Sequence, residues 1–250
     1  DDNNHRWPRP PQLATISPQY TRPCKAPCDF VHFRALGKRW GNVANGAGIS
    51  AHHPRFSRIS AGIVRHPISC ARRCRTDSHE WGLDHGSWGV LHPMVPDADI
   101  PVVQMSLNRA LSGQQHFALG RALAPLRDEG VLILGSGNIT HNLRQFYHEG
   151  RNPTPDFRDA FVGRVLDAIE SDSAHTLFAF AADDTIAQLA VNSGEHYLPL
   201  LYALGARGDE EAGFACNFIE VPGLSMVGLC FGDAPLSTGL EGDIRLLHRA

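Results

Sequence analysis

Short apolar runs alternate with amphipathic segments in the chain from residue 81 onward. The runs "IPVVQMSL" (residues 100–107) and "VLILGSG" (residues 131–137) are bounded by Pro or Gly, as are buried strands of a covered sheet. Between them, "QQHFALGRALAPLRDEG" (residues 114–130) carries apolar residues near helical spacing and stops at a glycine. The pattern predicts a strand, a helix and a second strand.

Two more segments have the pattern of helices. Residues 154–171, "TPDFRDAFVGRVLDAIES", place aromatic and aliphatic side chains on one stripe and offer Thr154 or Asp156 as an N-cap. Residues 195–206, "EHYLPLLYALGA", predict a buried helix with Pro199 near its first turn, where proline is tolerated.

The C-terminal part has a β-like pattern. Residues 214–231, "FACNFIEVPGLSMVGLCF", predict two strands joined through Pro222 and Gly223, a hairpin that we expect at a sheet edge. Strands and helices that alternate in this way indicate the α/β class. We predict a single domain with a mixed central sheet flanked by helices on both faces.

The first 80 residues differ from the rest in pattern and in charge. They show neither strand alternation nor a helical stripe longer than about two turns. They hold 13 of the 23 Lys and Arg residues but only 5 of the 26 Asp and Glu residues. Basic segments rich in Pro and Arg are usually disordered tails or nucleic-acid arms. We therefore divide the chain into a basic segment, 1–80, expected to be irregular, and a domain over 81–250.

The apolar stretches of the chain are too short to cross a membrane as helices. No stretch approaches the roughly 18 consecutive apolar residues needed to span a bilayer. No charged and then apolar segment of the secretory kind opens the sequence. These features predict a cytoplasmic protein that does not contact a membrane.

Three histidines follow small residues or turn signals: His85 in "LDHGSWGVL", His141 in "SGNITHNL" and His196 in "GEHYLPLL". Imidazole suits proton transfer near neutral pH and metal ligation. Taken singly, each such histidine is more often a hydrogen-bonded structural residue than a catalytic one. The histidines that we expect at the surface are His92, His116, His148 and His175.

Four motifs together carry more information than any one histidine. In their order and separation, "DHGSWGVL", "MVPDADIPVVQMSL", "SGNITHNLR" and "EHYLPLLYALGA" resemble the class III extradiol ring-cleavage dioxygenases, in the 4,5-DOPA dioxygenase branch of the LigB-like superfamily. The resemblance runs from about residue 80 to residue 232. It implies a LigB-like fold and cleavage of a catechol-type ring with O2. It also implies non-haem Fe(II), or zinc in the purified protein, as cofactor, and no nucleic-acid partner.

The resemblance also implies roles for individual residues. His141 would be the acid/base histidine, which takes a proton from the catechol and later returns it. His196 would be a metal ligand, with neighbouring Glu195 as an alternative ligand, and His85 would contact the substrate or bound oxygen. Residues implied on the substrate side are Asp84, Trp88 and Asn138, although Trp88 also suits a core position.

Two metal-ligand motifs of the family, "HGSP" and "SAHW", are absent as such; residues 49–53, "ISAHH", contain only "SAH". If the codons of residues 53–71 are read one nucleotide later, synonymous choices spell "IHDFHGFPQELYDIRYPAP", which resembles the family's "TIHDFGGFP" and "YPAPG" segment. The same shift over residues 28–37 allows "AILFISAHWE". We therefore hypothesise that much of 1–80 is an out-of-frame translation, which leaves the catalytic domain N-terminally incomplete.

This hypothesis predicts impaired metal binding, and two other readings stay open. A chain that keeps only His196 of the family's ligands would bind iron poorly. A metal site needs several residues that bind the ion directly and further residues that orient them by hydrogen bonds. The protein could instead be an inactive relative that binds aromatic molecules. Alternatively, a basic zinc module could contact nucleic acid. Its ligands would be Cys24, Cys28, His32, Cys70, Cys74 and His79. The sequence identifies neither the catechol nor the oligomeric state.

Overall fold

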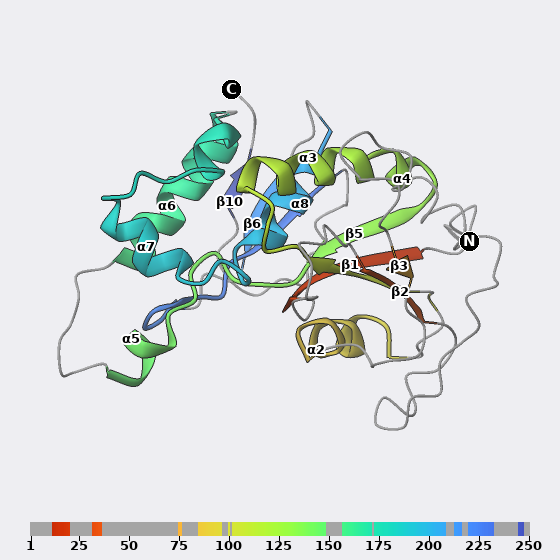
Figure 1. Cartoon of the computed structure of the whole chain (residues 1–250), viewed down its shortest axis with the longest axis horizontal. Helices are drawn as coiled ribbons and strands as arrows, with labels where there is room; N and C mark the ends of the chain where they lie inside the picture. Colours follow the sequence, from red (N-terminus) through yellow and green to blue (C-terminus); the bar gives the residue numbers. More distant parts are fainter. Residues whose placement is uncertain are drawn as a thin grey trace, which may run out of the picture.

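The strands among the described residues form three separate sheets (Figure 1). Within the described part of the chain, these are a five-stranded sheet, a three-stranded sheet and a two-stranded ribbon. The computed structural model describes residues 12–20, 32–36, 75–76, 85–96, 100, 102–148, 157–171, 173–208, 213–216, 220–232 and 245–247.

The five-stranded sheet is mixed, as predicted. Its strands, in spatial order, are β3 (Arg75–Thr76), β2 (His32–Leu36), β4 (Val102–Leu107), β1 (Gln12–Tyr20) and β5 (Val131–Gly135). Strand β1 runs parallel to both of its neighbours, whereas β2 runs antiparallel to β4. The two strands predicted from the pattern after residue 81, β4 and β5, therefore flank β1 in the sheet.

Three of these strands lie within residues 1–80, where the sequence pattern predicted no strand. The prediction was wrong for β1, β2 and β3. Strand β1 has a parallel strand on each side, and strands inside such sheets need no alternation of polar and apolar residues. The cysteines of the suggested zinc module, Cys24, Cys28, Cys70 and Cys74, lie outside the described residues.

Helices cover both faces of this sheet, which confirms the predicted layering (Figure 1). Helix α2 (His85–Met94) covers one face, where Leu91 packs with Val102 of β4. The next residue, Val103, faces the opposite layer, as the two-residue period of a strand requires. The helices of that layer are α3 (Gly113–Leu123), α4 (Pro125–Asp128) and α8 (Leu198–Ala206).

The helix predicted over residues 114–130 is interrupted at Ala124. Helix α3 ends before it, and α4 begins at Pro125, which has no N–H to continue the hydrogen-bond ladder of α3. The start of α3 is fixed by a capping box, in which Ser112 and Gln115 exchange side-chain to backbone hydrogen bonds of 2.8 and 3.3 Å.

His116 is buried, so its predicted surface position was wrong. It lies on the face of α3 that packs against α8, and its Nδ1 is 2.8 Å from the hydroxyl of Tyr202. The two helices approach closely because a glycine stands at the contact: a Cβ on Gly205 would lie 2.2 Å from the carbonyl oxygen of Phe117. His92 and His175 are exposed, as predicted, and the side chain of His148 lies outside the described residues.

A second group of helices packs beside the sheet, around its own apolar core. It consists of α6 (Phe157–Glu170), η1 (Ala174–Leu177) and α7 (Thr185–Val191), with the short α5 (Leu143–His148) at its lower edge in Figure 1. Helix α6 confirms the predicted amphipathic helix; its candidate caps, Thr154 and Asp156, lie outside the described residues. Among the helices of the described residues, none is long and apolar enough to cross a bilayer.

The C-terminal strands form the predicted hairpin, which lies in two sheets separate from the five-stranded one. Strands β7 (Glu220–Val221) and β8 (Leu224–Ser225) pair antiparallel on either side of Pro222 and Gly223, and the φ of Gly223 is +70°. Farther from the turn, the chain on either side of the hairpin forms two more antiparallel strands, which belong to the three-stranded sheet. Its strands, in spatial order, are β10 (Arg245–Leu247), β6 (Gly213–Cys216) and β9 (Gly228–Phe231).

Candidate active site

The turn that follows β5 lies against the segment that carries His196. The backbone N–H of Asn138 donates to the carbonyl oxygen of His196 at 2.9 Å. A Cβ on Gly137 would lie 2.1 Å from the same oxygen, so only glycine allows this approach. The end of a sheet strand is where open α/β folds place their sites, and here it meets a histidine.

His141 is held at the same place by its main chain. Its N–H donates to the carbonyl oxygen of Ala190 at 2.9 Å, near the end of α7. On its other side, His141 forms an isolated antiparallel bridge with Leu224 of β8. The neighbouring Ser225 donates its N–H to the carbonyl oxygen of Thr140 at 3.1 Å. His141 is therefore fixed between a helix end and the hairpin.

The imidazoles of His141 and His196 lie face to face. Their ring centroids are 3.5 Å apart and their planes differ by 13°. Both side chains are half-buried. The two histidines are 55 positions apart in the chain, and the fold brings their rings into direct contact.

Burial lowers the pKa of His141 below its ordinary value of 6.5, and the carboxylate of Glu195 and a backbone hydrogen bond oppose this effect in part. Glu195 in turn accepts a hydrogen bond from the hydroxyl of Ser193, with an oxygen to oxygen distance of 2.6 Å. A lowered pKa keeps the imidazole neutral at neutral pH, and only the neutral ring can accept a proton.

A buried tyrosine anchors the chain immediately after His196. Tyr197 is 2% exposed, and its hydroxyl donates to the carbonyl oxygen of Leu177 at 3.2 Å. Burial raises the pKa of the Tyr197 hydroxyl, so it remains a neutral donor. The turn that carries His196 is thus tied to the core of the second helix group.

Asn138 uses its side chain within the protein. Its Nδ2 donates to the carbonyl oxygen of Ser225 at 2.8 Å, and Met226 Sδ lies 3.9 Å from the same nitrogen. This bond joins the turn after β5 to the hairpin. The expected contact of Asn138 with a substrate stays a prediction. Because Nδ2 is bonded to Ser225 O, this contact would be made by Oδ1.

The N-terminus of α2 approaches the same turn through a residue that the sequence analysis did not identify. Ser136, which is buried, donates its hydroxyl to the carbonyl oxygen of Gly86 at 2.7 Å. This places the backbone of His85, the first residue of α2, near the end of β5. Asp84 and the side chains of His85 and Trp88 lie outside the described residues, so their roles stay predictions.

The described residues do not fit a complete metal site. Among them, no group of three or more His, Cys, Asp or Glu side chains is arranged to hold an ion. The nitrogen lone pairs of an imidazole lie in the ring plane, and the planes of His141 and His196 are nearly parallel. An ion about 2.1 Å from one ring nitrogen therefore cannot lie in the plane of the other ring as well.

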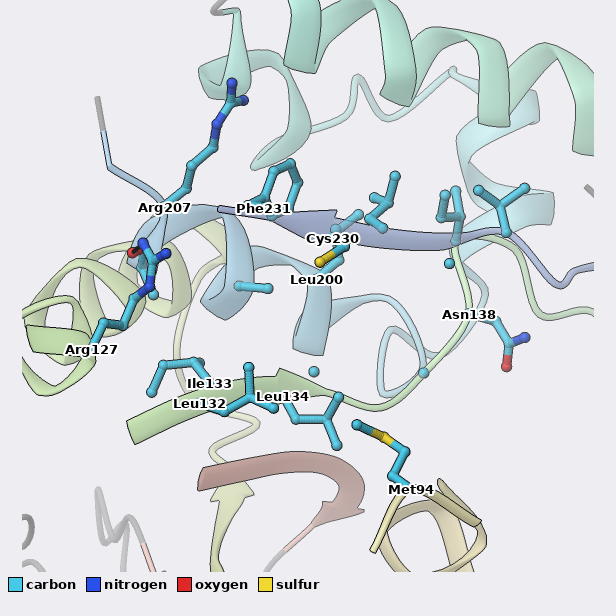
Figure 2. A pocket seen from close by; sticks show the side chains of 18 of the residues that line it. Met94, Arg127, Leu132, Ile133, Leu134, Asn138, Leu200, Arg207, Cys230 and Phe231 are labelled. Carbon is cyan, nitrogen blue, oxygen red and sulfur yellow. Dashed lines mark hydrogen bonds between the residues drawn. The ribbon is translucent and has the colours of Figure 1, made fainter. Parts of the chain in front are cut away.

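A cavity of about 390 Å³ extends from this site between β5, α8 and β9. Figure 2 shows Arg127 and Arg207 on one side of it and Asn138 and Met94 on the other. His196 also lines the cavity. Aliphatic side chains of the strands and of α8 supply most of its wall, so the space next to the histidine pair suits an apolar or aromatic group.

Comparisons with known proteins support the resemblance that the four motifs indicated. Residues 53–232 match the family model described as the catalytic LigB subunit of aromatic ring-opening dioxygenase. The match begins within the segment that we separated as 1–80. Over 161 residues the chain is 42% identical to the 4,5-DOPA dioxygenase extradiol of Escherichia coli K12, covering 62% of this chain and 59% of that protein.

A plant protein and a solved structure extend the comparison. The chain is 41% identical over 135 residues to the 4,5-DOPA dioxygenase extradiol of Beta vulgaris, covering 51% of this chain and 47% of that protein. The chain thus spans about half of each of these relatives. The crystal structure of an uncharacterized protein from Escherichia coli K12 superposes with a TM-score of 0.67 at 32% identity, covering 89% of this chain and 86% of the other. The chain therefore belongs to the LigB family of aromatic ring-opening dioxygenases.

Proposed function

We propose that the protein is an extradiol dioxygenase, which opens a catechol-type ring beside one of its hydroxyl groups with O2. The contact of His141 with His196 is the observation that carries this proposal. It joins the two motifs most closely tied to the chemistry, at the end of β5 and beside an apolar cavity. The relatives named 4,5-DOPA dioxygenase extradiol point to the same substrate class.

In the proposed reaction, His141 accepts a proton from a catechol hydroxyl. Its lowered pKa keeps the ring neutral before the substrate binds, which is the state a general base requires. Loss of the proton leaves a negative charge on the phenolic oxygen. The resulting imidazolium would lie near Glu195, whose carboxylate favours the charged ring.

LigB-family dioxygenases depend on a metal ion, which binds and activates the substrates. We propose that the ion is Fe(II), with zinc as its substitute in protein handled in air, and that His196 is one ligand. The near-parallel rings support different roles for the two histidines, because their ring nitrogens do not converge on one point: His196 would hold the ion and His141 would take the proton. Since the sequence contains neither "HGSP" nor "SAHW", the motifs that carry the family's other ligands, we expect this chain to bind iron weakly.

A second candidate is an inactive relative that binds an aromatic molecule next to His141 and His196. The absence of "HGSP" and "SAHW" from the sequence favours it. Such a protein would keep the cavity but turn over nothing. The two candidates differ in what restoring the missing ligand motifs would achieve.

The test uses two proteins: this chain, and a version whose reading frame is restored over residues 28–37 and 53–71. Both are loaded with Fe(II) without oxygen, and O2 uptake is then recorded with a catechol such as DOPA. We expect catechol-dependent uptake and a yellow ring-opened product from the restored protein, and little or none from this chain. If the restored protein holds iron but consumes no O2, it is not an extradiol dioxygenase.

A further inference from the structure

The side chain of Asn142, next to His141, joins two helices. Asn142 is 8% exposed. Its Nδ2 donates to the carbonyl oxygen of Leu189 at 3.0 Å, in the last turn of α7. Its Oδ1 accepts from the backbone N–H of Gln145 at 3.2 Å, in the first turn of α5. One amide group thus uses its donor and its acceptor on different elements.

The backbone of Asn142 adds a third attachment. Its N–H donates to the carbonyl oxygen of Gly223 at 2.8 Å, in the turn of the β7–β8 hairpin. A Cβ on Gly223 would lie 2.5 Å from the carbonyl oxygen of Asn142, so the two backbones are in close contact. Helix α7, helix α5 and the hairpin therefore meet at this one residue.

The last four carbonyl groups of a helix lack partners within it. At the end of α7, the carbonyl oxygens of Gln188 and Val191 accept from the following turn, where Asn192 and Gly194 donate their N–H groups at 3.2 and 2.9 Å. The other two are used by the site. Ala190 O accepts from the N–H of His141, and Leu189 O accepts from Asn142 Nδ2. The pair His141–Asn142 therefore completes the C-terminus of α7.

This attachment bears on the histidine pair because α7 leads directly to His196. Helix α7 ends at Val191, and the turns that follow it carry His196 only five residues later. The same stretch of chain therefore holds the backbone of His141 at one end and the ring of His196 at the other. A shift of His141 relative to α7 would change the separation of the two rings.

We propose that Asn142 is a positioning residue that sets the ring of His141 against that of His196. This proposal rests on the proposed function, since it assigns a purpose to the spacing of the two histidines. The required side chain has a donor and an acceptor at one carbon, with the reach of an asparagine. Aspartate has the same shape and the acceptor but no donor for Leu189 O.

The simpler interpretation is that Asn142 only caps α5. Aspartate and asparagine are about equally good N-caps, so Asn142→Asp keeps the capping oxygen, while it replaces the donor to Leu189 O by a negatively charged acceptor. Asn142→Ser also keeps a capping oxygen, and its side chain is too short to reach α7. The two variants separate positioning from capping in different ways, so a folding failure of one leaves the other.

The first measurement is the proton chemical shift of the His141 ring by NMR, in the iron-free chain. A ring stacked on another aromatic ring is shifted by its field, and exposed His175 supplies the unstacked reference. In both variants we expect the His141 signals to move more than half of the way to those of His175. The control is Ser112→Ala, which removes the cap of α3 and should leave the signals in place. Unchanged signals in both Asn142 variants would overturn the proposal.

The second measurement uses the frame-restored protein with Fe(II). Misplacement of a catalytic group by about 1 Å can cost up to 100-fold in rate, so we expect a 10- to 100-fold lower kcat with nearly the same KM in Asn142→Asp. A lower kcat with unmoved His141 signals would also contradict positioning. If the restored protein has no activity at all, the proposed function fails, while the NMR comparison still decides the role of Asn142.

Discussion

The imidazole of His116 and the hydroxyl of Tyr202 share a hydrogen bond of 2.8 Å between α3 and α8. Both side chains are fully buried. Burial lowers the pKa of His116 from 6.5 to about 4, although a hydrogen bond between His116 and the backbone of Asn108 opposes this effect in part. The folded protein therefore keeps His116 neutral at a pH where the unfolded chain would bind a proton.

The first prediction concerns the pH dependence of stability. Between pH 6.5 and about 4 the unfolded chain binds more protons at this site, so the contribution of His116 is complete above pH 6.5 and is lost as the pH falls. We expect His116 to contribute a loss of about 2–3 kcal/mol in the free energy of unfolding from pH 7 to pH 4.5, measured by urea denaturation as the difference from His116→Gln. His116→Gln should lose less over the same range, and His175→Gln, at an exposed position, should follow the unsubstituted protein. Equal pH dependence in all three proteins would contradict the burial of His116.

The second prediction tests the close contact of α3 and α8. A Cβ on Gly205 would lie 2.2 Å from a backbone oxygen, so Gly205→Ala must move a helix and should destabilise the protein by about 1–3 kcal/mol. Gly163, inside α6, is the matched control because nothing lies within 4 Å of its Cβ position. Gly163→Ala should stabilise by about 0.5–1 kcal/mol. Thermal denaturation of the two variants would refute the packing if both shift in the same direction.

Local patterns predicted the elements whose surroundings are ordinary. Strands β4 and β5, helix α6 and the hairpin at Pro222 and Gly223 follow from apolar runs, helical spacing and turn residues. His116 was misplaced because polarity alone suggests a surface position. Its burial depends on a partner, Tyr202, that is 86 positions away and comes into view only in the folded protein.

The candidate site also has features that the sequence predicted and features that only the fold shows. The motif order predicted that His141 and His196 belong to one site, and the structure brings their rings together. Two polar residues around this pair, Ser136 and Asn142, make hydrogen bonds to backbone atoms of α2 and α7. Any residue can supply a backbone carbonyl, so no pattern in the sequence of the acceptor reveals such a bond. Asn142 does carry a weak signal, because asparagine directly before a helix is a common N-cap.

The third prediction concerns a buried hydroxyl beside His141. Thr140 is 0% exposed, and its Oγ1 has no hydrogen-bond partner among the described residues. A buried hydroxyl without a hydrogen-bond partner lowers stability by about 1–3 kcal/mol. Valine fills nearly the same volume and has no hydroxyl to bury. Thr140→Val should therefore stabilise the protein by about 1 kcal/mol in urea denaturation. A clear loss of stability would show that Oγ1 has a partner, such as a bound water molecule.

The last prediction separates the roles of the two stacked histidines in the frame-restored protein. Loss of a metal ligand weakens the site itself, and removal of even a supporting residue commonly costs about 10–100-fold in affinity, so His196→Ala should lose iron on dialysis. Loss of a positioned acid/base group removes about 10²–10⁴ in rate and leaves the ligands in place, so His141→Ala should keep its iron and turn over slowly. The measurements are iron per chain by elemental analysis and O2 uptake with saturating catechol. The near-parallel rings favour one ligand and one proton acceptor, because their ring nitrogens do not converge on one point. If His141→Ala is free of iron while His196→Ala retains it, the two roles are exchanged, and His141 is the ligand.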